Sequence, residues 1–201
     1  MRNRSATVSL GLLAAATTVA DAHTPFKGAN AFYTGLLHPV VVPPEALAVV
    51  ALALLFGTSG ALASRLGLAL FATGLLIGLC CGQLALAVPG WTTPALLAVA
   101  LMMAIIVTTG LRPPPGLAAV IAVVTGAIVG LDALPDASSG RDIWLGSAAT
   151  ILGGLIVAVI VSGLIVNGRQ HWRRIAIRVA GSWITASAVL YFAWLFATHQ
   201  S

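Results

Sequence analysis

The residues best suited to chemistry are a histidine and a glutamate in an apolar segment interrupted by prolines. His38 and Glu45 are seven positions apart, about two helical turns, so their side chains share one side if the segment is helical. An imidazole nitrogen and a carboxylate oxygen can bind a divalent metal together. The pair can equally form a structural hydrogen bond, or Glu45 can simply begin a helix, where the helix dipole favours a negative charge. The sequence leaves these roles open.

Two further candidate ligands lie elsewhere in the chain. Asp132 ends an apolar run, and the aspartates that follow it could attract cations or simply belong to a solvated loop. His23 would become the first residue if the amino terminus is cleaved, and its α-amine and imidazole could then chelate copper or nickel. An ordinary residue at a cleavage site is the simpler interpretation of His23.

The sequence contains no motif that indicates catalysis. It has no G-x-x-x-x-G-K, H-E-x-x-H, C-x-x-C or G-x-S-x-G pattern. Both cysteines lie in one apolar run, which excludes a disulfide framework. We therefore do not expect an enzyme.

The composition predicts a chain that lies in a bilayer. Of its 201 residues, 59% are apolar and only 7% are charged, whereas a soluble domain carries about a quarter charged residues. The mean hydropathy is +1.03. The net charge of +5 does not indicate nucleic-acid binding, because the basic residues lie between apolar runs, where they act as orientation signals.

The first 22 residues have the features of a secretory signal peptide. Two arginines precede an apolar stretch too short to span a membrane, and residues 20–22 (Ala-Asp-Ala) match the pattern that signal peptidase recognises. We expect cleavage before His23, which leaves residues 23–201 as a single membrane domain. An uncleaved first helix is the alternative.

Six further apolar runs are each long enough to cross the hydrocarbon as a helix, which needs about 20 residues. They lie at residues 45–64, 67–88, 94–111, 116–134, 144–166 and 175–197. The predicted fold is an all-α integral membrane bundle of six helices. With His23 outside, six arginines fall on the inner side and only Lys27 and Arg141 on the outer side, as the positive-inside rule requires. We expect a bacterial inner-membrane protein with both mature termini in the periplasm.

Glycines spaced four apart predict close helix packing. Gly74, Gly78 and Gly82 form one row on the second run, and Gly126 and Gly130 form another on the fourth. Without side chains, two backbones can approach closely, and dispersion then holds the helices together in lipid. The rows could join helices or subunits, so the oligomeric state stays open.

The chain resembles the HupE/UreJ family of membrane proteins linked to hydrogenase and urease maturation. The resemblance begins with His23 and continues through residues 31–39, which are similar to the family's Gly-Phe-x-x-Gly-Phe-x-His-Pro segment and end in His38-Pro39. Residues 125–135 resemble its His-Gly-x-Ala-His-Gly-x-Glu segment, with Asp132 at the acidic position. The resemblance implies a six-span permease whose substrate is nickel or cobalt rather than copper. It also implies metalloenzyme-maturation proteins as partners.

The departures from this family fall on its metal ligands. His38 is the one motif histidine present, whereas Glu45 replaces a family histidine and Thr125 and Val129 replace two more. Carboxylates in place of imidazoles favour harder ions and weaken nickel binding.

Two functions are therefore expected. The first is a permease for a divalent transition metal, with His23, His38, Glu45 and Asp132 forming the entry and binding path. The second is a non-transporting membrane protein that assists the assembly of a metalloenzyme or another membrane complex.

Overall fold

A computed structural model describes residues 30–84, 90–134, 139–166 and 171–198, and these residues form helices and short connectors. In chain order the helices are α2 (Ala31–Val41), α3 (Pro43–Ser59), α4 (Ala61–Gln83), α5 (Thr92–Thr109), α6 (Pro115–Asp132), α7 (Gly140–Val166) and α8 (His171–Thr198). The described residues contain no strand. The predicted all-α membrane bundle is thus confirmed, whereas the signal peptide and His23 lie outside the described residues.

Five of the helices, α4 to α8, are long and apolar enough to cross a membrane, although α8 meets this test only from Trp172. The other two, α2 and α3, pass the same test together, as a pair bent by 68°. Prolines explain the bend. Val42 precedes Pro43 and has an extended backbone (φ −83°, ψ 109°), as expected before a proline. Pro43 and Pro44 also lack the N–H groups that would continue the hydrogen bonds of α2.

The predicted boundary between the first two spans is wrong. We expected runs at residues 45–64 and 67–88, but α3 ends at Ser59 and α4 begins at Ala61. Gly60 separates them with φ 100° and ψ 170°, a conformation that is essentially restricted to glycine. Helices α7 and α8 also begin earlier than predicted, at Gly140 and His171.

The two glycine rows face each other across α4 and α6. A Cβ atom added at any of four of these glycines would meet a backbone carbonyl oxygen of the opposite helix. Gly74, Gly78, Gly126 and Gly130 lie against the carbonyl oxygens of Val123, Ala127, Phe71 and Leu75, respectively. Gly82 instead lies against the side chain of Leu134. The rows therefore join two helices within one chain.

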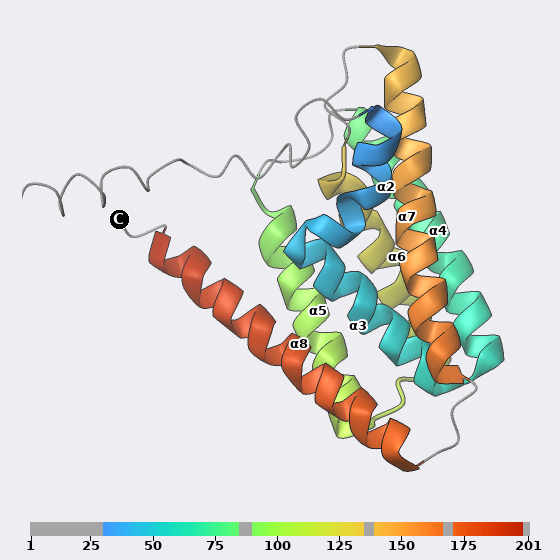
Figure 1. The fold of residues 1–201 in the computed structure, drawn as a ribbon, viewed down its shortest axis with the longest axis vertical. Helices are drawn as coiled ribbons and strands as arrows, with labels where there is room; N and C mark the ends of the chain where they lie inside the picture. Colours follow the sequence, from blue (N-terminus) through green and yellow to red (C-terminus); the bar gives the residue numbers. More distant parts are fainter. Residues whose placement is uncertain (1–29, 85–89, 135–138, 167–170, 199–201) are drawn as a thin grey trace, which may run out of the picture.

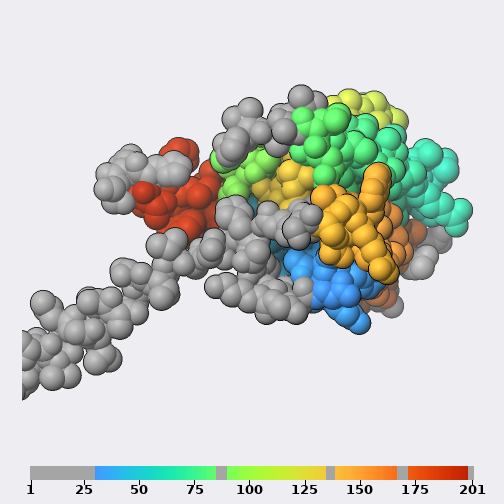
Figure 2. Space-filling view, turned by 90° about the horizontal axis from the view of Figure 1, so that it is seen from above, coloured from blue at the N-terminus to red at the C-terminus, as the bar shows by residue number. Residues whose placement is uncertain are grey.

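Helix α3 forms the centre of the bundle, and α8 lies at its side. The buried core includes Ala48, Val49 and Leu52 of α3, which pack with residues of α4 and α5. Helix α2 runs beside α7 (Figure 1), and Gly35 of α2 lies directly against Gly146 of α7. Helix α8 contacts mainly α5 and diverges from the other helices toward its carboxyl end (Figures 1 and 2).

Most arginines of the described segments lie at one end of the bundle and the carboxylates at the other, where Arg141 is the exception. Arg112 follows α5 and Arg65 lies near the start of α4, at the end where α3 meets α4. Asp132 ends α6 and Asp142 begins α7, at the opposite end. Glu45 lies in the first turn of α3, so it is also far from the arginine-rich end.

Candidate functional site at the helix break

The structure brings His38 and Glu45 into direct contact. The Nδ1 atom of His38 lies 3.0 Å from Oε2 of Glu45, within hydrogen-bond distance. The histidine side chain is 13% exposed, and the glutamate side chain is completely buried. The proximity expected from their spacing is therefore observed, whereas a role in binding metal stays a prediction.

The bend between α2 and α3 produces this contact. In a straight helix, positions seven apart are separated by about 10 Å along the axis. Here His38 lies in the last turn of α2 and Glu45 in the first turn of α3. The bend at Val42 shortens the path between them. The amino terminus of α3, whose first N–H groups lack helical partners, also favours a carboxylate at this position.

The second oxygen of Glu45 has no hydrogen-bond partner. Oε1 is buried, and no donor among the described residues reaches it. A buried polar atom without a partner costs about 1–3 kcal/mol, and an unpaired ionised carboxylate costs more. A proton or a bound cation would satisfy this oxygen.

Asp132 is an electrostatic neighbour of Glu45. It lies at the carboxyl end of α6 and is partly buried. Its carboxyl group is thus a second acidic group in the surroundings of Glu45. It does not complete a three-ligand set, because no group of three or more His, Cys, Asp or Glu side chains within the described ranges could hold a metal ion. His23 lies outside those ranges.

The spacing of His38 Nδ1 and Glu45 Oε2 is compatible with a shared cation as well as with a hydrogen bond. Metal–nitrogen and metal–oxygen bonds of about 2.1 Å place two adjacent octahedral ligands about 3.0 Å apart. The distance between His38 Nδ1 and Glu45 Oε2 is also 3.0 Å. A cation could therefore replace the shared proton without separating the helices, provided that both ligand atoms turn toward it.

Thr125 lies at a position where the HupE/UreJ segment that the chain resembles has a histidine, and its hydroxyl group already has a hydrogen-bond partner. Thr125 is completely buried in α6, and its hydroxyl donates to the carbonyl oxygen of Ile121 in the same helix. Val129, at the second such position, is also completely buried. Neither side chain adds a ligand beside His38.

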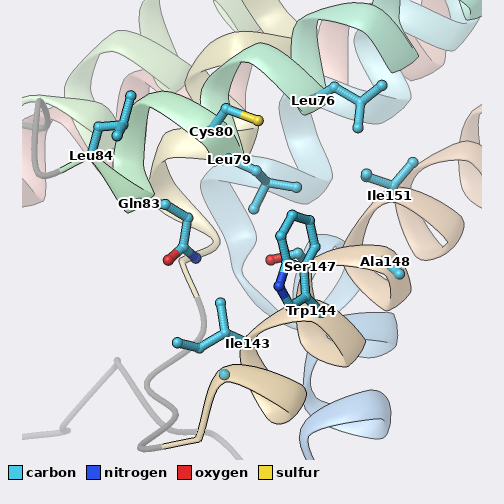
Figure 3. Close-up of a pocket in the computed structure, with 11 residues that line it drawn as sticks. Leu76, Leu79, Cys80, Gln83, Leu84, Ile143, Trp144, Ser147, Ala148 and Ile151 are labelled. Carbon is cyan, nitrogen blue, oxygen red and sulfur yellow. The ribbon is translucent and has the colours of Figure 1, made fainter.

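Two of the cavities that lie away from this site have polar side chains in their lining. One, of about 590 Å³, is an open cleft between α4 and α7, where Trp144, Leu79 and Gln83 are among the residues that line it (Figure 3). No histidine or carboxylate lines this cavity. The other lies between Arg112, Arg174 and Arg178, which the sequence predicts only as orientation signals. The four-residue spacing of Arg174 and Arg178, about one helical turn, is the signal in the sequence for their clustering.

Comparisons of the chain with protein-family models, curated proteins and solved structures find no match. The resemblance to the HupE/UreJ family therefore rests on the residues quoted above and stays a prediction.

Proposed function

We propose that this membrane protein is a permease for a divalent transition-metal cation, of the nickel or cobalt type. His38 and Glu45 supply the two protein ligands, and water completes the coordination of the ion. The observation that carries this proposal is the completely buried Glu45, which touches His38 and keeps an oxygen without a partner among the described residues. Ionisable residues within membrane segments are costly and commonly mark ion pathways.

The position of the pair in a broken helix supports transport. Membrane transporters commonly bind ions where a helix is interrupted, because the interruption frees backbone groups and helix ends. The pair α2 and α3 is bent by 68° where His38 and Glu45 meet. A site on a bend can also open or close with a small change in the angle between the two helices.

The charge distribution supports entry of the cation from the periplasm. Arginines lie mainly at one end of the bundle, and the positive-inside rule assigns that end to the cytoplasm. The His38–Glu45 pair and Asp132 then lie toward the periplasmic side of a bacterial inner membrane. Under the family resemblance, the imported metal serves metalloenzyme-maturation proteins.

The direct hydrogen bond favours one alternative. Because His38 and Glu45 already contact each other at 3.0 Å, their hydrogen bond can have a purely structural role and hold α2 and α3 at their observed angle. A protein in which this hydrogen bond is structural could be a non-transporting accessory protein that assists the assembly of a metalloenzyme or another membrane complex.

Metal uptake distinguishes the two functions. Cells that lack their own nickel and cobalt transporters would express the wild type, His38→Ala, Glu45→Gln or the control Asp142→Asn, whose side chain is partly exposed and accepts a hydrogen bond from Ser139. Transport predicts uptake by the wild type and the control, and loss of uptake at normal protein abundance in the other two. A structural role of the hydrogen bond predicts no uptake by the wild type, and a lower abundance of the His38→Ala and Glu45→Gln proteins.

A further inference from the structure

Three arginines surround a cavity at the end of the bundle opposite the His38–Glu45 pair. The cavity has a volume of about 380 Å³ and lies where α3, α5 and α7 end and α8 begins, at the lower end of Figure 1. Arg112 comes from the segment after α5, whereas Arg174 and Arg178 come from the first turns of α8. Three guanidinium groups from two elements therefore converge on one space.

No carboxylate in the part of the chain that the structure describes forms an ion pair with these arginines. The chain has no acidic residue between positions 46 and 131, nor after Asp142, so Glu45 of α3 and Asp142 of α7 lie at the opposite ends of the helices that line this cavity. The one ion pair in the described residues is that of His38 with Glu45. Among the described residues no carboxylate is paired with these arginines, so they are able to bind an anionic ligand.

The carbonyl oxygens at the ends of the described helices do not accept hydrogen bonds from these three arginines either. Arg173 shows the ordinary use of an arginine at a helix end, since its Nη1 donates to the carbonyl oxygen of Leu164 in α7 at 3.3 Å. Arg112, Arg174 and Arg178 make no such hydrogen bond to any described residue. Their donors remain available to a ligand in the cavity.

The surroundings of the cavity fit a lipid better than a free anion. Leu111, which lines the cavity, is 65% exposed, and Ile175 beside Arg174 is 54% exposed. These exposed apolar side chains, one in the connector after α5 and one on α8, lie beside the arginines, so a ligand with an anionic head and an apolar tail matches both surfaces. Basic pockets between membrane helices on the cytoplasmic side commonly hold phosphate headgroups.

We propose that the cavity lined by Arg112, Arg174 and Arg178 binds the phosphate of an anionic phospholipid headgroup. The guanidinium forks hold the phosphate oxygens, which two or more arginines can share. The lipid joins the first turns of α8 to the ends of α3 and α5. This link stabilises the attachment of α8, whose carboxyl half diverges from the bundle.

The test measures lipid binding to the full-length protein in neutral detergent. Native mass spectrometry would give apparent dissociation constants for phosphatidylglycerol and for the zwitterionic phosphatidylcholine. The variants are Arg174→Gln, Arg178→Gln and the control Arg65→Gln, an exposed arginine at the same end that does not line the cavity. A basic residue near an anionic lipid surface contributes about 1 kcal/mol to binding, so the loss of one cavity arginine should raise the apparent dissociation constant about fivefold.

The proposal expects tighter binding of phosphatidylglycerol than of phosphatidylcholine, with a weakening of about fivefold in each cavity variant and no change in the control. Arg178→Lys should retain part of the affinity, because it keeps the charge but loses the planar fork. Equal binding of the two lipids, or an equal loss in Arg65→Gln, would overturn the site. Displacement of phosphatidylglycerol by millimolar inorganic phosphate would show a free-anion site instead.

Discussion

Substitution of Gly78 by alanine tests the contact between α4 and α6. The Cβ atom of the new side chain would overlap the carbonyl oxygen of Ala127 and lie 2.8 Å from its carbon atom. A backbone carbonyl cannot move aside as a side chain can, so the two helices must separate. A gap of about 0.5–1 Å removes a quarter to a half of the dispersion attraction between the affected atoms.

The expected destabilisation follows from this separation. Overpacking of a tight contact costs about 1–3 kcal/mol, while alanine gains up to about 1 kcal/mol over glycine in a helix interior. Gly163→Ala is the matched control, because Gly163 lies within α7 and a Cβ there would meet no atom within 4 Å. The propensity gain is common to both variants, so their difference isolates the packing cost of about 1–3 kcal/mol.

The assay is reversible unfolding of the purified protein in mixed micelles with increasing dodecyl sulfate, followed by circular dichroism. Gly78→Ala should have a lower unfolding free energy than Gly163→Ala, and Gly78→Leu a lower one still. Equal unfolding free energies for Gly78→Ala and Gly163→Ala would show that α4 and α6 do not approach as closely as the structure indicates.

Three further predictions concern the backbone, the orientation and the acidic neighbour. Gly60→Ala should lower the unfolding free energy by about 1–3 kcal/mol, because φ 100° with ψ 170° strains any residue with a side chain. The control Gly116→Ala should not lower it, since a Cβ there meets no atom within 4 Å. Equal unfolding free energies of the two variants would contradict the turn at Gly60. Alkaline phosphatase should be active when fused after residue 200 and silent when fused within residues 167–174, and the reverse pattern would reject the proposed orientation. Asp132→Asn should reduce cation uptake without abolishing it, because Asp132 acts on Glu45 through its charge; unchanged uptake would exclude it from the path.

Hydropathy was sufficient to predict the bundle, but not the points at which its helices break. The apolar residues on both sides of Thr58, Ser59 and Gly60 carried the predicted first span across this point, because hydropathy contains no information on φ. The spacing of His38 and Glu45 predicted their proximity, but their contact depends on the bend at Val42 rather than on one continuous helix. The closeness of Asp132 to Glu45 depends on how α6 packs near α3, which no local pattern determines.

The arginine cavity shows a similar limit of sequence patterns. Arg174 and Arg178 share a helix face, so their clustering is local and can be predicted from their spacing. Their proximity to Arg112 depends on the contact between α5 and α8, which exists only in the folded bundle.

The central claim is that His38 and Glu45 together carry a transported cation. The most direct test is nickel flux into proteoliposomes that contain the purified wild type, His38→Ala or Glu45→Gln, with an internal metal-sensitive dye. The proposal predicts saturable flux through the wild type, and loss of that flux in both variants while each elutes from gel filtration like the wild type. Flux that persists in a folded Glu45→Gln protein, or a folded wild type that passes neither nickel nor cobalt, would contradict the claim.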